Sequence, residues 1–170
     1  MTITNSIFYN NSCQHPDSLG QAIYSPILYG RINMNNCSFI DNEYESNILA
    51  SVIYSCSELT LLNSNFSVSE PNNLNTKSLH LGASASLSLV NSTFTNFSAI
   101  NGSSLYYESN EGKDPDFFEI INNTFIGIND EVGNDIYLNI LFLPIIINCT
   151  FINKHLKDSD LIIFDFIIYP

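Results

Sequence analysis

Basic residues are scarce in this chain. Its 170 residues include five Lys or Arg residues against seventeen Asp or Glu residues, which gives a formal net charge of −12 at pH 7. Binding to nucleic acid or to an anionic membrane requires a basic patch or stripe, and Arg31 is the single arginine. The composition therefore argues against a nucleic-acid-binding protein.

Long hydrophobic runs are also missing. The longest one, at residues 140–147, is far shorter than the roughly 20 residues that a membrane-spanning helix needs. The N-terminus lacks a charged segment followed by an apolar run and a small-residue cleavage site, so no signal peptide is predicted. We therefore expect no transmembrane segment in these residues.

Cysteine occurs four times, in a pattern that does not suggest the usual cysteine-based sites. No two cysteines are spaced as in a zinc motif. Cys37 and Cys149 occupy equivalent places in the repeat described below but lie four repeats apart, about 19 Å at the usual strand spacing and beyond the reach of a disulfide. Small buried thiols are therefore the favoured interpretation of Cys13, Cys37, Cys56 and Cys149.

What the sequence does contain is a repeated phrase. Six asparagines recur at intervals of 31, 27, 28, 31 and 26 residues, and each is followed by phenylalanine three residues later. Six copies indicate a repeat architecture. The asparagines are Asn5, Asn36, Asn63, Asn91, Asn122 and Asn148, and the phenylalanines are Phe8, Phe39, Phe66, Phe94, Phe125 and Phe151.

Apolar side chains stand two and four residues before most of these asparagines, with polar ones between them. In the second copy, Ile32 and Met34 flank Asn33. Such alternation with a period of two indicates strands rather than helices. A looser phrase with an aromatic end falls between the asparagines and predicts a further strand; its copies end at Tyr24, Tyr54, Tyr106, Tyr137 and Phe164.

Three short strands in each repeat of 26–31 residues, without a helical period, predict an all-β parallel β-helix. We expect a single domain over residues 1–170 with about six rungs. Rungs lie about 4.8 Å apart, so equivalent residues stack in columns. Phenylalanine is expected to stack inside, and asparagine to turn the chain at a corner because it tolerates the left-handed conformation. The small or polar residue after each asparagine suits a crowded inner corner.

This pattern resembles the right-handed parallel β-helices of the pectin-lyase-like superfamily, and among them the repeats of the polymorphic outer-membrane proteins and their relatives on protist surfaces. Short signatures of that group are a Phe-x-x-Asn phrase and a Gly-Gly-Ala-Ile type phrase. Residues 8–11 (FYNN), 39–42 (FIDN) and 20–23 (GQAI) match them. The resemblance implies a right-handed solenoid and a non-catalytic surface or secreted protein, an adhesin-like scaffold whose partner is a carbohydrate or a cell-surface protein.

Enzymes of the same superfamily cleave acidic polysaccharides with clustered Asp and Arg or Lys residues, either directly or through Ca²⁺. Here Arg31 stands alone, the three histidines are scattered over different repeats and loops, and no Asp pair recurs on a strand face. We therefore predict no catalytic residues and no cofactor. An incomplete or degenerate polysaccharide lyase or glycoside hydrolase is the alternative, and a structural spacer is a third hypothesis.

Two kinds of polar site are suggested by single residues. Asp130 and Asp135 lie in an oxygen-rich loop and are weak candidates for calcium ligands, although a solvated turn is favoured. Asn10, Asn96 and Asn101 are the favoured acceptors for N-glycosylation. Four of the column asparagines also begin Asn-x-Ser/Thr sequons, but we expect them to be buried and poorly available.

Four apolar residues immediately precede column asparagines, at a phase that should point outward: Leu62, Val90, Ile121 and Ile147. An exposed apolar stripe marks a partner or a covering loop, while a corner that turns these side chains inward is an equal alternative.

No capping helix is recognisable at either end of the repeats. We therefore expect residues 1–170 to be an uncapped segment of a longer repeat protein, with further repeats at both ends, located at the cell surface or outside the cell.

Overall fold

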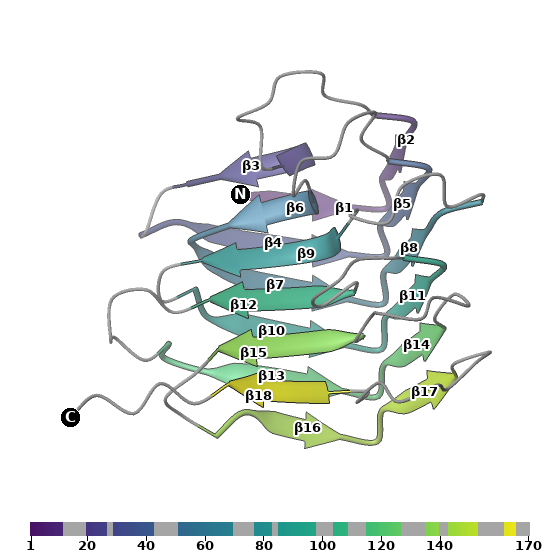
Figure 1. Ribbon diagram of the computed structural model, residues 1–170. Coiled ribbons are helices and arrows are strands. Elements are labelled where there is room, and N and C mark those ends of the chain that lie inside the picture. The colour runs from purple at the N-terminus through teal and green to yellow at the C-terminus, as the bar shows by residue number, and fades with distance from the viewer. Residues whose placement is uncertain are drawn as a thin grey trace.

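Short alternating segments of the chain form parallel β-strands that stack into a solenoid (Figure 1). All regular secondary structure in the part of the chain that the structure describes is β-strand, so the predicted all-β parallel β-helix is confirmed. No helix able to cross a membrane is found there. The computed structural model describes residues 1–11, 20–26, 29–42, 51–69, 77–82, 85–97, 104–108, 115–126, 135–139, 143–152 and 162–165.

The apolar pair before each asparagine forms the first of three sheets, sheet A. Ile32 lies opposite Leu59 and Met34 opposite Leu61, and all four side chains are buried. The period of two thus places one side of each strand in the core. In spatial order the strands are β1 (Thr2–Thr4), β4 (Arg31–Asn35), β7 (Glu58–Leu62), β10 (Leu87–Val90), β13 (Phe118–Ile121) and β16 (Ile145–Ile147).

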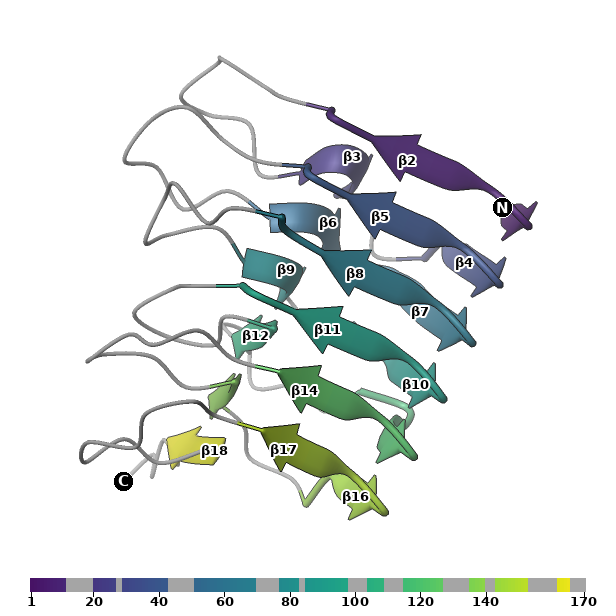
Figure 2. The same cartoon turned by 90° about the vertical axis from the view of Figure 1, so that its right-hand side faces the viewer.

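The phenylalanine of each repeat is the central residue of a three-residue strand, and these strands form sheet B, which faces the viewer in Figure 2. The six phenylalanine rings stack in one column, with neighbouring centroids 4.5–5.2 Å apart and interplanar angles of 4–12°. The predicted inner phenylalanine column is confirmed. The strands are β2 (Ile7–Tyr9), β5 (Ser38–Ile40), β8 (Asn65–Ser67), β11 (Thr93–Thr95), β14 (Thr124–Ile126) and β17 (Thr150–Ile152).

The tyrosine-type phrases form sheet C, where the predicted tyrosines stand in register. The last strand differs by one residue, because Ile163 rather than Phe164 lies opposite Tyr137. Phe164 lies opposite Leu138, one residue after Tyr137, so the assignment of Phe164 to this column is wrong. The strands are β3 (Gly20–Ser25), β6 (Ser51–Ser55), β9 (Lys77–Gly82), β12 (Leu105–Glu108), β15 (Ile136–Asn139) and β18 (Ile162–Asp165).

The repeated asparagine turns the chain from sheet A to sheet B in the left-handed conformation. The six φ angles lie between 50° and 56°, a region that asparagine adopts more readily than most residues. The amide of Asn36 donates to Asn5 Oδ1 at 2.8 Å, and that of Asn91 donates to Asn63 Oδ1 at 3.3 Å. The expected corner role of asparagine is confirmed.

The side chains of these asparagines are nevertheless exposed, so the expectation that the column sequons are buried is wrong. Each asparagine stands at the outer tip of a two-residue corner, and the residue after it takes the inner position. The sequons concerned begin at Asn36, Asn91, Asn122 and Asn148.

The inner corner carries a second ladder of hydrogen bonds. The backbone N–H of Ser64 donates to Ser92 Oγ at 3.1 Å, and that of Ser92 donates to Asn123 Oδ1 at 2.8 Å. All three side chains are buried. Since buried polar groups require partners, this ladder explains why the residue after each asparagine is small or polar.

The phrase Phe-x-x-Asn has a similar structural role after sheet B. Asn42 is buried, and its amide nitrogen donates to the carbonyl of Phe8 at 2.9 Å. Its Oδ1 accepts a bond of 2.7 Å from the amide of Asn11, the equivalent residue in the first repeat. These asparagines therefore join one rung to the next.

The first and last rungs differ from those between them. Four of the six strands in each sheet have neighbours on both sides, whereas the outermost strands are paired along one edge only. The inward residues Ile3, Phe8, Ile146 and Phe151 are correspondingly only partly buried. About six equivalent rungs were expected, but the solenoid has about four fully enclosed turns and two half-covered ones.

Candidate functional site

Two strands of sheet C, β6 and β9, differ from the strands of the other two sheets because they are buried on both faces. Every residue of β6 and β9 except Tyr54 and His80 is buried, whereas β5, β8 and β11 in sheet B bury only the central residue. Ser78 and Val52, on the outer face of sheet C, are 0% and 1% exposed. The outer face of sheet C is therefore the most enclosed polar surface among the described residues.

An aromatic column runs along this face: Tyr24, Tyr54, His80, Tyr106 and Tyr137. Neighbouring ring centroids are 4.9–5.4 Å apart. The tyrosine pairs at both ends of the column are stacked, and His80 meets its two tyrosine neighbours edge-on. Because each ring is covered by the next, the column presents ring edges rather than a flat platform for a sugar ring.

A buried cation lies against the same column. Lys77 is 2% exposed, and its Nζ is 3.4 Å from the centroid of the Tyr106 ring, in the following rung. An ammonium group over an aromatic face is attracted by the ring's quadrupole, most strongly when both are removed from water. This contact helps to offset the cost of burying the lysine.

His80 is held in its neutral form. Burial, and secondly the positive charge of Lys77, lower the pKa of His80 from 6.5 to about 4. Its Nδ1 has no hydrogen-bond partner among the described residues, and the same holds for Ser78 Oγ and the side-chain amide of Gln21.

The apolar stripe lies on the outer side of sheet A. Leu62, Val90, Ile121 and Ile147 stand opposite one another in consecutive strands. The first three are half-buried, and Ile147 in the last rung is 47% exposed. The column continues with Asn35 in the second rung, so the stripe is confined to the later rungs.

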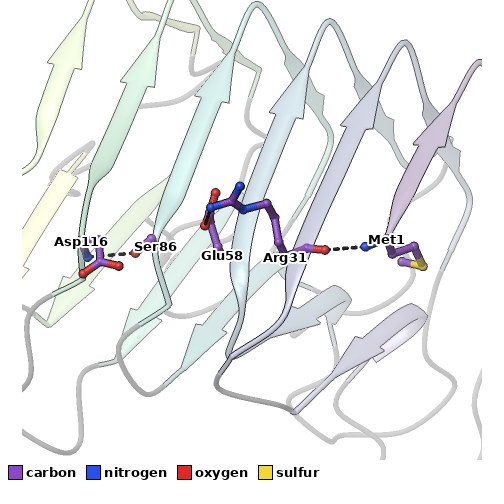
Figure 3. A network of polar contacts seen from close by, with 5 residues as sticks. All are labelled: Met1, Arg31, Glu58, Ser86 and Asp116. Atoms are coloured by element: carbon purple, nitrogen blue, oxygen red, sulfur yellow. Dashed lines mark hydrogen bonds and ion pairs between the residues drawn. The ribbon is translucent and has the colours of Figure 1, made fainter.

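The one arginine takes part in a polar network along the start of the sheet A strands, shown in Figure 3. Its guanidinium forms an ion pair of 2.8 Å with Glu58 in the next rung, and its carbonyl accepts a bond of 2.6 Å from the N-terminal ammonium of Met1. Further along the edge, the N–H of Asp116 donates to Ser86 Oγ at 2.9 Å. Arg31 is thus engaged in rung-to-rung pairing, and within the described ranges its ion pair is with Glu58.

The predicted polar sites have different surroundings. Asp135 is 3% exposed, and Asp130 lies outside the described residues. Asn10 is exposed with φ of 50°, Asn96 is half-buried with its amide bonded to the carbonyl of Val68 at 3.0 Å, and Asn101 is outside the described ranges. No group of three His, Cys, Asp or Glu residues that could hold a metal occurs within the described ranges.

The described cysteines are free thiols. Cys37 and Cys56 are buried, and Cys149 is half-buried. The Sγ atoms of Cys37 and Cys149 lie near backbone carbonyls at 3.5–3.6 Å, in the inner corner of their rungs. Cys13 lies outside the described residues.

Sequence reasoning missed Lys77 and His80. The third repeat has the sequence KSLHLG where its neighbours have a phrase that ends in tyrosine. A pattern based on tyrosine therefore does not identify this strand. The spacing from the preceding phenylalanine would have found it, because β9 begins eleven residues after Phe66 and β12 begins eleven residues after Phe94. Burial of the lysine has no signal in the sequence.

Comparisons of the chain with protein-family models, with curated proteins and with solved structures find no match.

Proposed function

We propose that this protein is a non-catalytic repeat scaffold, on a cell surface or secreted, that binds a partner in the manner of an adhesin. The observation that carries the proposal is the constant construction of one edge of the solenoid. Two residues join sheet A to sheet B in every rung, whereas nine or ten residues join sheet B to sheet C. These connections are residues 10–19, 41–50, 68–76, 96–104, 127–135 and 153–161.

The ends of the sheet B strands and the starts of the sheet C strands repeat at every rung, so each rung anchors one long connection. Binding residues are often carried on connections of this kind, positioned by a rigid scaffold. Here the stacked phenylalanines and the asparagine corners provide the scaffold. The pectin-lyase-like and outer-membrane-protein-like character of the repeats, expected from the sequence, supports the same proposal.

The composition of these connections favours a basic partner. The six connections contain ten of the seventeen acidic residues and two of the five basic residues, which gives 2 − 10 = −8 of the total charge of −12. Complementary potentials speed and favour association, and like potentials oppose it. A basic surface on a cell-surface protein is therefore a better match for these acidic connections than an acidic polysaccharide is.

The same charge weakens the enzyme alternative. A degenerate lyase or hydrolase acting on acidic polysaccharides would have to bind a polyanion with a chain of net charge −12, and Arg31 is paired with Glu58. We therefore keep catalysis as the second candidate only. Release of unsaturated or reducing ends from pectin-like polymers would establish it.

A binding screen tests the scaffold proposal. The purified protein is applied to arrays of glycans and of extracellular domains, and we expect capture by basic extracellular domains that weakens as salt is raised. The double variant Glu43→Gln/Glu45→Gln, in one connection, should reduce capture several-fold. The control Glu119→Gln, on sheet A, should not. No capture on either array would favour the spacer hypothesis.

Location is tested separately by protease shaving of whole cells followed by mass spectrometry. Peptides from the chain released by intact cells support a surface protein. A species protected until the cells are lysed contradicts this part of the proposal.

A further inference from the structure

The aromatic column on the outer face of sheet C contains two stacked pairs of tyrosines. The ring centroids of Tyr24 and Tyr54 are 5.4 Å apart, with an interplanar angle of 27°. Those of Tyr106 and Tyr137 are 5.1 Å apart, with an angle of 8°. His80 lies between the two pairs and meets Tyr54 and Tyr106 edge-on. The described part of the column therefore consists of two tyrosine pairs separated by an imidazole.

The register of sheet C brings equivalent atoms of each pair together. Tyr106 lies directly opposite Tyr137, and Tyr24 lies opposite Tyr54, in parallel strands. Parallel strands in register stack equal positions, so the nearly parallel rings of a pair bring the carbons beside the two phenol oxygens close to one another. These ortho carbons carry much of the unpaired electron of a tyrosyl radical. They are therefore the atoms that join when two tyrosines couple.

The surroundings of the second pair favour coupling within one chain over coupling between chains. Tyr106 and Tyr137 are both half-buried, so a radical on either ring is closer to its stacked neighbour than to a ring of another molecule. The Nζ of Lys77 lies 3.4 Å from the centroid of the Tyr106 ring, a contact that helps to hold this ring in place. The chain contains no tryptophan, which is the aromatic side chain that competes with tyrosine for one-electron oxidation.

A thiol distinguishes the first pair from the second. Cys56 is 7% exposed, and its S–H donates to the phenol oxygen of Tyr54 at 3.3 Å. A hydrogen atom that passes along this bond to a radical on Tyr54 restores the phenol and leaves the unpaired electron on sulfur. Of the three described thiols, Cys56 is the one that bonds to a ring of this column, since Cys37 and Cys149 donate to backbone carbonyls. The first pair is therefore protected against coupling.

We propose that Tyr106 and Tyr137 form an oxidative cross-linking site, at which a one-electron oxidant that consumes hydrogen peroxide joins the two rings. The oxidant removes one electron and one phenolic proton from each tyrosine. The two radicals form a bond between their ortho carbons, and the hydrogen on each joined carbon moves to the phenol oxygen of its own ring. Hydrogen peroxide accepts the two electrons and two protons and is reduced to two molecules of water.

The product is a covalent link between β12 and β15, two neighbouring strands of sheet C. A covalent bond that closes a loop of the chain stabilises the fold chiefly by restricting the unfolded state, as a disulfide does. The described cysteines of this chain are free thiols, so the tyrosine cross-link supplies the kind of covalent link that disulfides supply elsewhere. The cross-linked protein should therefore unfold at a higher urea concentration than the untreated protein.

Treatment of the purified protein with a haem peroxidase and hydrogen peroxide tests the proposal. The monomer should lose the mass of two hydrogen atoms and gain the fluorescence of dityrosine, and proteolysis should release one cross-linked peptide pair that contains Tyr106 and Tyr137. The yield should not depend on protein concentration, because the reaction is intramolecular. Dimers linked through exposed tyrosines such as Tyr29, which is 91% exposed, should become rarer on dilution.

Conservative variants separate this site from general oxidation. Tyr137→Phe keeps the stacked ring but removes the phenol, so it should abolish the intramolecular cross-link. Tyr29→Phe, outside the column, is the control and should retain it. Cys56→Ser removes the thiol and should add a second cross-link, between Tyr24 and Tyr54, while the first one remains. Circular dichroism checks that the variants fold.

The proposal is overturned if the exposed tyrosines are oxidised while no peptide pair with Tyr106 and Tyr137 is formed. The same loss of mass from the Tyr137→Phe monomer as from the wild type contradicts it as well. If Tyr24 and Tyr54 couple in the wild type as readily as the second pair does, the protective role of Cys56 is wrong.

Discussion

Sheets B and C are built from strands in the same parallel register, yet they use their columns differently. In sheet B one residue type, phenylalanine, occupies the central position in all six rungs. In sheet C the aromatic column changes from tyrosine to histidine at His80, and a lysine is buried against it. The phenylalanine column has the same residue in every rung, so it makes the same structural contribution along the whole solenoid. The properties of His80 and Lys77 therefore belong to their rung alone.

The largest expected effect concerns the uniform column. Phe94 is fully buried between the rings of Phe66 and Phe125, at 4.8 and 5.2 Å. Phe94→Ala should lower the free energy of unfolding by about 3–5 kcal/mol, because it removes the ring and leaves a cavity. Urea denaturation measures the loss. Thr95→Ala, at the next and half-buried position, is the control and should change stability by about 0.5 kcal/mol or less. A loss below that of an ordinary surface change would contradict the structural role of the column.

The second effect tests the divergent rung through pH. The pKa of His80 is about 4 in the folded protein, against 6.5 as its ordinary value. The unfolded state therefore binds a proton that the folded state resists, and His80 destabilises the fold progressively as the pH falls from 6.5 to 4. The lost stability reaches about 3 kcal/mol at the lower limit.

Many carboxylates titrate in the same range, so the wild type alone cannot isolate His80. We expect His80→Tyr, which makes the column all tyrosine from Tyr24 to Tyr137, to lose less stability between pH 6.5 and 4 than the wild type does. Above pH 7 the two proteins should differ little in this respect. Urea denaturation across the range measures the difference, and parallel pH curves for the two proteins would refute a neutral buried histidine.

A third effect concerns the buried lysine. Lys77→Met keeps the apolar stem but removes the ammonium group from the Tyr106 ring, and we expect a loss of about 1–2 kcal/mol. The pKa of His80 should rise towards 6.5 without reaching it, because the positive charge of Lys77 is the smaller of its two causes and burial remains. A titration of the His80 ring protons by NMR measures the shift. An unchanged pKa would mean that the lysine does not act on the histidine.

The fold could be predicted from the sequence because its determinants repeat. Phenylalanine and asparagine recur at every rung. Apolar residues alternate along each strand with a period of two, which determines the side of the strand that is buried. The exposure of the asparagine side chains was not predictable in the same way. It depends on which of two corner residues takes the outer position, and the φ angles of 50–56° decide this.

The candidate site was largely hidden for the opposite reason. Lys77 and His80 occur in a single rung, so no repetition marks them, and their burial depends on packing around sheet C. The apolar stripe could be seen because it recurs in four rungs. Its degree of exposure, which rises to 47% at Ile147, follows from the position of that residue in the last rung rather than from its identity.

The smallest expected effect contrasts an exposed ion pair with the buried lysine. Arg31 and Glu58 approach to 2.8 Å, but the arginine side chain is 67% exposed and the glutamate 25%. Pairs of this kind contribute about 0–1 kcal/mol, because water and salt screen the charges. A double-mutant cycle with Arg31→Met and Glu58→Gln should therefore give a coupling energy in that range that decreases as salt is added. A coupling larger than the whole effect of Lys77→Met would reverse the comparison, since it would show that the edge of sheet A, and not the enclosed face of sheet C, contains the stronger electrostatic contact.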